Sequence, residues 1–406
     1  MTTPAVPLDL VPAEAPATPR LVRPAHDTIL ANADLVLGRE VMRGSIVLRD
    51  GQIAAIDTGT AVPAGAEDCD GQLIIPGLVE LHTDNLERHL MPRPKVKWPG
   101  RPAVLSHDGE LAAAGITTVF DAVRVGSMRR AEGASKDYAK YARGIVDDIK
   151  ALREAGLTRI DHRIHLRAEV CSETVLEELE EFTTEDAVAI VSIMDHTPGQ
   201  RQFADLSKFC DYFQGKYNLS DLEMDAHIAF TKGLHDRLGR SHEDGIVARA
   251  QALGAHLASH DDTTAAHVAR SAELSVEFAE FPTTVEAAAA CRAAGIPVMM
   301  GAPNILRGGS HSGNVAAMTL AEQGLLDILS SDYVPAALMM GAMALADATG
   351  DLPAAIATVT ANPAEAVGLV DRGRLEVGLR ADVLRVVRHD GVSIITGVWS
   401  AGRQVG

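Results

Sequence analysis

The stretch LIIPGLVELHTD, residues 73–84, decides the fold of this chain. An apolar run ends in His82 and Asp84, and the spacing of two residues puts both side chains on the same side of an extended strand end. In a barrel of parallel strands, the chemistry lies at the carboxyl ends of the strands. The polar residues that end the other apolar runs of the chain are therefore candidates for the same chemistry.

Eight apolar runs have the length and composition of strands, and Ala-, Leu- and charge-rich stretches of helical character lie between them. The runs are residues 73–82, 116–122, 160–169, 187–196, 256–260, 274–280, 296–302 and 325–332. Strands that alternate with helices predict βα units and a parallel sheet. Eight such units predict an α/β protein with a (β/α)8 TIM-like barrel rather than an open doubly wound sheet, and no GxGxxG or GxxxxGK[ST] motif occurs.

Both ends of the chain carry short β-branched runs, with Asp50-Gly51 and Asp390-Gly391 as expected hairpin turns. We therefore expect a small β-sandwich domain built from residues 28–75 and 368–406, with the barrel formed by residues 76–367. Residues 1–27, which begin with a proline-rich stretch, are expected to be a flexible tail.

The composition describes a globular chain of 406 residues, of which 47% are hydrophobic. The 37 Lys and Arg residues against 55 Asp and Glu residues give a net charge of −18, which argues against nucleic acid or an anionic membrane as partner. The four cysteines form no CxxC pair, and no apolar stretch reaches the roughly 20 residues of a membrane span. We expect a cytoplasmic protein with reduced thiols.

Six polar residues end five of the predicted strands, and such a set is typical of a divalent metal site. They are His82, Asp84, Glu169, His196, His260 and Asp332. Imidazole and carboxylate ligands without cysteine suit Zn²⁺ or Mn²⁺. We expect two divalent ions bridged by Glu169, which would activate a water molecule for hydrolysis, with Asp332 as both ligand and general base.

Two further segments indicate an anionic, phosphorylated substrate. Residues 85–101 hold five Lys or Arg residues against one Glu, which reverses the sign of the chain's net charge beside the expected metals. Residues 304–314 are rich in glycine and offer backbone N–H groups, as a phosphate cradle does. The predicted substrate-binding residues are Asn85, Arg93, Lys95, Arg124, Arg307 and His311.

Three short motifs resemble the amidohydrolase superfamily: PGLVELH at residues 76–82, GITTV at 115–119 and EVGLRAD at 376–382. That resemblance implies a metal-bearing barrel with a small β-sandwich made from both chain ends. Four longer motifs are similar to its diphosphatase family of the carbon–phosphorus lyase pathway: HTDNLE at 82–87, HLRAE at 165–169, MDHTPGQ at 194–200 and RGGSHSGN at 307–314. They imply a phosphorylated ribosyl alkylphosphonate substrate, whose 5-triphosphate is hydrolysed to the 5-phosphate and pyrophosphate in phosphonate catabolism.

The chain departs from the commoner superfamily pattern at three points. Asp84 stands where many members have a second histidine, and Glu169 stands where many have a carboxylated lysine. Counted from residue 73, Glu169, His196 and His260 end the third, fourth and fifth strands, whereas the superfamily commonly places the two later histidines one strand further along.

Two functions other than hydrolysis of this triphosphate remain open. A C–N hydrolase of the same superfamily, of the adenine deaminase or dihydroorotase type, would share the metals but would need no loop with five cations. A non-catalytic scaffold on the same fold would be expected to have lost metal ligands, and all six are present here. The sequence leaves open whether the chain forms a homo-oligomer.

Overall fold

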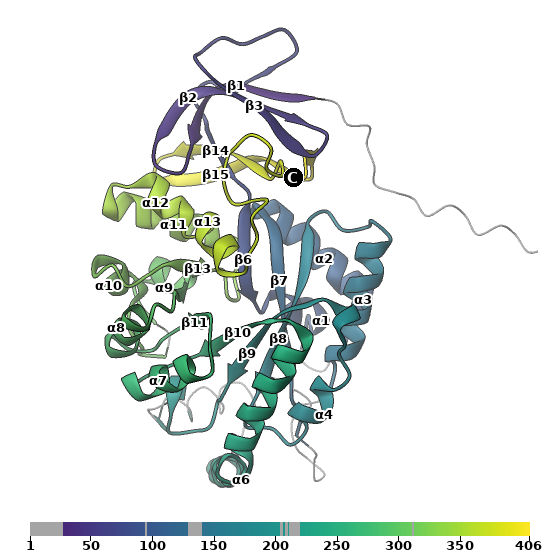
Figure 1. Cartoon of the computed structure of the whole chain (residues 1–406), viewed down its shortest axis with the longest axis vertical. Helices are drawn as coiled ribbons and strands as arrows, with labels where there is room; N and C mark the ends of the chain where they lie inside the picture. The colour runs from purple at the N-terminus through teal and green to yellow at the C-terminus, as the bar shows by residue number, and fades with distance from the viewer. Residues whose placement is uncertain are drawn as a thin grey trace, which may run out of the picture.

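A computed structural model describes residues 27–93, 96–128, 140–203, 206–207, 210, 220–310 and 312–406. It consists of a barrel of parallel strands surrounded by helices, with a separate β-sheet at one end (Figure 1). Strands from both ends of the chain make up that sheet, so the N-terminal and C-terminal segments lie side by side. The predicted fold class is confirmed.

The barrel contains the eight strands that the apolar runs predicted. They are β6 (Leu78–Thr83), β7 (Ile116–Val125), β8 (Asp161–Glu169), β9 (Val188–Met194), β10 (His256–His260), β11 (Phe278–Glu280), β12 (Val298–Gly301) and β13 (Ile328–Ser330). All seven neighbouring pairs are parallel and follow chain order. Glu169, His196 and His260 therefore lie at the ends of the third, fourth and fifth strands, as counted from the sequence.

The first and last strands meet through a single bridge between Thr83 and Asp332. The backbone N–H of Asp84 donates to the carbonyl of Asp332 at 2.9 Å, and the Thr83 hydroxyl donates to the same carbonyl. This closure puts Asp84 and Asp332 next to each other although they lie at opposite ends of the barrel sequence.

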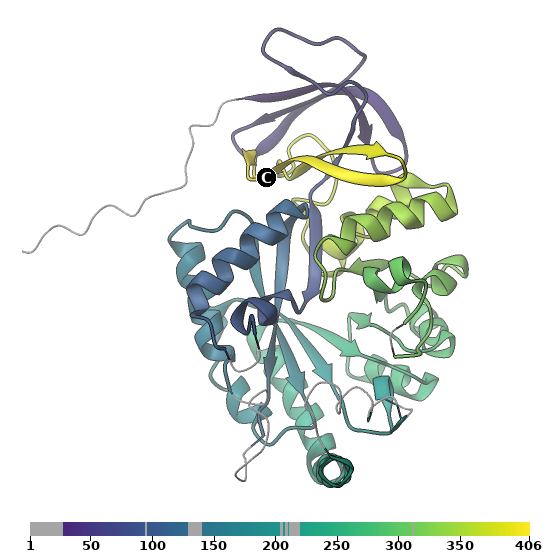
Figure 2. The same ribbon diagram turned by 180° about the vertical axis from the view of Figure 1, so that it is seen from behind.

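Helices pack around the barrel, as the views from both sides show (Figures 1 and 2). They are α1 (Asn85–Leu90), α2 (Gly100–Ala113), α3 (Ala142–Glu154), α4 (Val175–Leu179), α6 (Asp221–Leu253), α7 (Ala265–Glu273), α8 (Val285–Ala294), α9 (Ala302–Arg307), α10 (Ala317–Glu322), α11 (Ala337–Thr349), α12 (Leu352–Ala357) and α13 (Ala361–Ala366). Helix α6 is 33 residues long. A capping box of Ser220 and Glu223 begins it, and Gly254 ends it in the left-handed conformation.

The second sheet combines β1 (Thr28–Val36), β2 (Val41–Arg49), β3 (Gln52–Thr58), β4 (Glu67–Asp68) and β5 (Leu73–Pro76) with β14 (Val383–His389), β15 (Val392–Ser400) and β16 (Arg403–Gln404). Its order is β16-β15-β14-β5-β1-β2-β3, and β4 pairs with β1. The antiparallel pairing of β5 with β14 joins the two chain ends. Both Asp-Gly turns are confirmed, because all four residues have φ between 49° and 81°, as a type I′ hairpin requires.

The interior of the barrel is packed with apolar side chains. Val79, Phe120, Phe278 and Ile328 are at most 1% exposed and form one cluster with residues of α13. In a barrel of this size such side chains fill the interior, so no channel runs through it. A site inside the barrel can therefore open only at one of its two ends.

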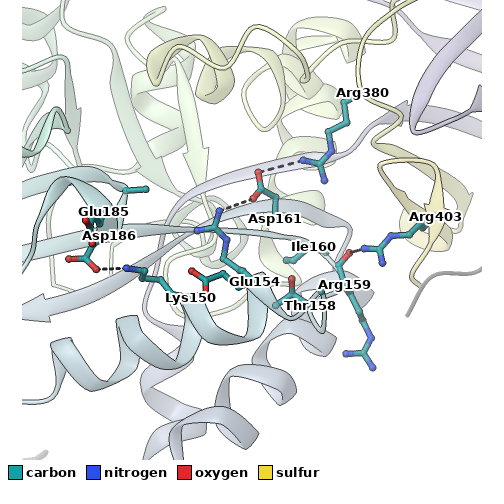
Figure 3. Close-up of a pocket in the computed structure, with 13 residues that line it drawn as sticks. Lys150, Glu154, Thr158, Arg159, Ile160, Asp161, Glu185, Asp186, Arg380 and Arg403 are labelled. Atoms are coloured by element: carbon teal, nitrogen blue, oxygen red, sulfur yellow. Dashed lines mark hydrogen bonds and ion pairs between the residues drawn. The ribbon is translucent and has the colours of Figure 1, made fainter. Parts of the chain in front are cut away.

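A charged pocket of about 570 Å³ lies at the other end of the barrel, where the strands begin (Figure 3). In Figure 3, Arg380 of the β-sheet domain faces Asp161 of the barrel, Arg403 donates to the carbonyl of Arg159, and Lys150 pairs with Asp186. Its charges are largely paired with one another: Asp161 contacts the guanidinium groups of Arg372 at 2.8 Å, Arg380 at 3.5 Å and Arg153 at 3.9 Å. These ion pairs join the β-sheet domain to the barrel.

We expect Asp161→Ala to lower the free energy of unfolding by about 2–4 kcal/mol, because it leaves the 5% exposed Arg372 without this partner. Asp147→Ala is the matched control, since its 61% exposed carboxylate pairs with Arg143 and is worth under about 1 kcal/mol. Thermal unfolding of both variants measures the difference. Equal melting temperatures would contradict the role of Asp161.

Candidate metal centre

A cavity of about 590 Å³ opens at the carboxyl ends of the barrel strands. Five of the six predicted ligands line it, namely His82, Asp84, His196, His260 and Asp332. The sixth, Glu169, is 5% exposed and contacts His196. The structure thus brings together residues from β6, β8, β9 and β10 and from the turn after β13.

The pairing of β6 with β7 shifts its register between Glu80 and Thr83, the stretch that contains His82, and His82 lines the cavity. The fully buried Glu80 carboxylate accepts the backbone N–H of His82 at 2.7 Å and hydrogen bonds from Ser330 and Ser331. Burial raises the pKa of Glu80. The His82 Nε2 atom lies 3.6 Å from the nearer carboxylate oxygen of Asp84, so both side chains face the cavity, as the spacing predicted.

Asp332 follows β13 in the left-handed conformation, with φ of 54°, a conformation that costs energy for a residue other than glycine. Its backbone holds this turn, since its N–H donates to the Ser330 hydroxyl and its carbonyl accepts the N–H of Asp84. Burial and the negative charge of Asp84 raise the pKa of Asp332 to about 7. Two carboxylates placed this closely require a cation or a proton between them.

Glu169 and His196 form a pair across β8 and the end of β9. A carboxylate oxygen of Glu169 lies 2.5 Å from His196 Nδ1, and the other accepts the backbone N–H of His196 at 3.2 Å. Although desolvation opposes both shifts, the pair raises the pKa of His196 and lowers the pKa of Glu169. The bridging role of Glu169 between two metals stays a prediction.

Two carboxylates that were not among the predicted ligands, Asp261 and Glu280, lie close to them. In the described part of the chain, His196, His260 and Asp261 have ligand atoms within 4.8 Å of one another, and so do His82, His165 and Glu280. Glu280 ends the predicted strand 274–280, so the rule that found the other ligands applies to it. Asp261 follows His260 directly, after the strand has ended, so only the geometry of the turn shows that its carboxylate lies near the ligands.

The donor set fits divalent metal ions. Imidazoles and carboxylates converge on a buried site, and such ligands suit Zn²⁺, Mn²⁺ or a similar ion. His82 Nδ1 and Glu280 Oε1 are buried without a hydrogen-bond partner, and Asp84 and Asp332 repel each other. These unsatisfied groups indicate that the site is built around positive charge.

The cationic groups are distributed differently from the prediction. Arg88, Arg167 and Arg307 line the cavity, and Arg167 also pairs with Asp84. Of the residues in segment 85–101, Arg88 is paired with Glu110, and Arg101 is paired with Asp148 at 3.0 Å. The positive charge of this segment is therefore partly neutralised, and its first six residues form helix α1.

Three of the other predicted substrate-binding residues, Asn85, Arg93 and Arg124, lie outside the lining of the cavity. Asn85 is buried, and its amide donates to Glu110 and contacts His107. The guanidinium of Arg124 lies 5.7 Å from the ring centre of Tyr141, and Arg93 is exposed and pairs with Val96 through the backbone. Lys95 and His311 fall outside the described residues.

Comparisons with known proteins identify the family of the chain. Residues 73–405 match the profile of the amidohydrolase family. The chain is 45% identical over 380 residues to alpha-D-ribose 1-methylphosphonate 5-triphosphate diphosphatase of Escherichia coli (strain K12), with 93% of this chain and 100% of that protein covered. It is 26% identical to imidazolonepropionase of Deinococcus deserti, with 90% and 94% covered.

Among solved structures, a putative prolidase from Bifidobacterium longum superposes with a TM-score of 0.60 at 18% identity, covering 93% of this chain and 94% of the other. At that identity the likeness concerns the fold alone. The family profile covers most of the chain and includes the strands that carry every proposed ligand. This chain therefore belongs to the amidohydrolase family.

Proposed function

We propose that this chain hydrolyses α-D-ribose 1-methylphosphonate 5-triphosphate to the 5-phosphate and pyrophosphate in phosphonate catabolism. The observation that carries the proposal is the 45% identity to the Escherichia coli diphosphatase of that name, which extends over its whole length. The cavity supports it with three arginines beside the ligand cluster, where a polyphosphate could be bound. The proposed catalytic barrel consists of residues 76–367.

We propose that His82, Asp84, Glu169, His196, His260 and Asp332 hold two divalent ions, with Zn²⁺ or Mn²⁺ best suited to these ligands. When bound, such ions polarise a phosphate oxygen and make a water molecule a better nucleophile near neutral pH. The chain's own contribution is to hold the carboxylates and imidazoles at the cavity floor. Packing of the barrel interior excludes bulk water from below.

Asp332 is proposed to accept the proton of the attacking water. Its carboxylate lines the cavity beside Asp84, where an attacking water molecule would lie within its reach. Its left-handed backbone directs the carboxylate beside Asp84 and toward the cavity. Release of pyrophosphate requires cleavage of the anhydride bond between the α- and β-phosphates. The water oxygen forms a new bond to one of these two phosphorus atoms, and the bridging oxygen leaves with the other product. The proton that Asp332 accepts then returns to solvent.

The triphosphate is proposed to lie along the wall formed by Arg88, Arg167 and Arg307. Gly309, Ser310, Ser312 and Asn314 also line the cavity, which supports the proposal that the glycine-rich segment binds phosphate. Asn85, Arg93, Lys95, Arg124 and His311 remain proposed substrate-binding residues.

Phosphorus NMR of the metal-supplemented enzyme tests the function. The ribosyl methylphosphonate triphosphate should yield pyrophosphate and the 5-phosphate, and ATP serves as the competing triphosphate. Orthophosphate as the first product would show cleavage of the other anhydride bond. No cleavage of any triphosphate by fully metal-loaded protein would reject the proposal, and cyclic amides and aminopurines would then be screened for a C–N hydrolase.

We expect Arg307→Ala to raise the KM for the triphosphate by about tenfold or more, because an arginine bound to phosphate typically contributes about 1.5–3 kcal/mol. The value of kcat should change less, since Arg307 lies at the exposed rim of the cavity. Arg240→Ala, on the outer face of helix α6, is the control with 66% of its side chain exposed. Equal KM values for both variants would place the triphosphate elsewhere.

A further inference from the structure

We propose that Glu280 is a positioning residue that holds the imidazoles of His82 and His260 so that both can bind metal. The proposal rests on the proposed metal centre and assigns a role to a carboxylate that was not among the predicted ligands. Glu280 contacts His82 and His260 on the side of their rings that faces away from the cavity.

Glu280 is the last residue of β11 and is fully buried. One of its carboxylate oxygens, Oε2, lies 2.9 Å from His260 Nδ1 and 3.1 Å from His82 Nδ1. The two rings are stacked, with centres 5.4 Å apart and planes 28° from parallel. Because the rings face the same way, a single oxygen reaches the same nitrogen of both.

This arrangement leaves the Nε2 atoms of both histidines on the cavity side. His82 Nε2 lies 3.6 Å from Asp84, and His260 Nε2 lies 3.3 Å from Asp261. A carboxylate behind a metal-binding imidazole fixes its tautomer, since Nδ1 keeps the proton, and makes Nε2 a better donor to the metal. Glu280 is placed to do this for two ligands at once.

His165, the third ring beside Glu280, does not compete for the carboxylate. Its Nδ1 lies 2.8 Å from the carbonyl of Leu81, and its Nε2 lies 2.9 Å from the Ser192 hydroxyl. The Nδ1–H therefore donates to the carbonyl, and Nε2 accepts from the hydroxyl. His165 packs edge-on against His82, with centres 5.1 Å apart, and so restricts the rotation of that ring.

The charge of Glu280 has no Lys or Arg partner within ion-pair distance among the described residues. A buried carboxylate without a cation is costly, and the cost is offset if the imidazoles in contact with it carry positive charge through a bound metal.

Metal titration of Glu280→Gln tests the proposal without reference to turnover. Metal-free protein is titrated calorimetrically with Zn²⁺ and with Mn²⁺, and the visible spectrum of the Co²⁺ form reports the geometry of the site. The amide keeps the volume but removes the negative charge that lies 2.9 Å from His260 Nδ1 and 3.1 Å from His82 Nδ1. Metal affinity should fall about 10–100-fold, with a changed Co²⁺ spectrum.

Glu178→Gln is the matched control, because this buried glutamate accepts from Gly126 and Thr174 and is 4% exposed. It should bind metal as the wild type does. If Glu280→Gln does not fold, Glu280→Asp tests the proposal instead. The shorter aspartate side chain cannot reach both rings, so the metal affinity of this variant should also fall. Wild-type affinity and spectrum in a folded Glu280 variant would overturn the proposal, whereas failure of the triphosphatase assay would leave it standing.

Discussion

Asp332→Asn is expected to lower kcat/KM for the triphosphate by about a thousandfold or more, since removal of a general base alone costs about 10²–10⁴. The same change removes a charged metal ligand and leaves an amide beside Asp84, so metal occupancy should fall as well. The initial rate of pyrophosphate release measures the loss, and metal analysis of the same sample separates the two causes. Activity close to wild type would exclude Asp332 from the reaction.

Asp327→Asn is the matched control, because Asp327 lies just before the same strand at its other end and pairs with Arg292. It should keep near wild-type activity. If it lost activity as severely, the effect of Asp332→Asn would reflect damage to strand β13 rather than chemistry.

Asp332→Asn should also stabilise the metal-free protein at alkaline pH. The pKa of Asp332 in the folded chain is about 7, above its ordinary value of 3.8, because of burial and Asp84. The fold therefore binds this proton more tightly than the unfolded chain does, and stability is lost as pH rises between those two values. Metal-free Asp332→Asn should melt above metal-free wild type at about pH 8, with the difference shrinking toward about pH 5.

Removal of divalent metal is the second change with a large expected effect. Chelation should abolish triphosphate hydrolysis and lower the melting temperature, because Asp84, Asp332, Glu169 and Glu280 then keep their negative charges in a buried space. Ligand binding at about a thousand times Kd contributes about 4 kcal/mol to stability, so the thermal shift should be large. Activity and melting temperature are measured on one chelated sample.

Return of Zn²⁺ or Mn²⁺ to the chelated protein should restore both quantities together. A chelated protein that is fully active, with metal analysis confirming its removal, would show that the ligands at the barrel mouth have no role in turnover. If stability returned but activity did not, the ion would stabilise the fold without taking part in the reaction.

Much of the fold could be predicted from local patterns. Eight apolar runs became eight parallel strands, and both Asp-Gly turns formed hairpins, because strand alternation and turn conformation depend on residues close in sequence. The meeting of polar residues at the strand ends could be predicted for the same reason: in a parallel barrel, all carboxyl ends open on one side. His82, Asp84, His196, His260 and Asp332 met there as expected.

Other features depended on contacts between distant segments. The cation-rich segment 85–101 appeared free in the sequence, yet Arg88 and Arg101 pair with carboxylates of α2 and α3. Arg167 pairs with Asp84 on another strand and lines the cavity, whereas Arg124 lies against Tyr141. A charge pattern shows which groups are present, but it does not show which of them are neutralised by neighbours.

Local alternation and strand endings were therefore enough to specify the barrel and most of the proposed ligands. Tertiary packing decided how those ligands are oriented and which charges remain available to a substrate. Glu280 illustrates the difference, because its carboxylate reaches His82 on β6 and His260 on β10 only after the barrel closes. Electrostatic interactions of this kind act through space over a few ångströms, and distance along the chain does not reveal them.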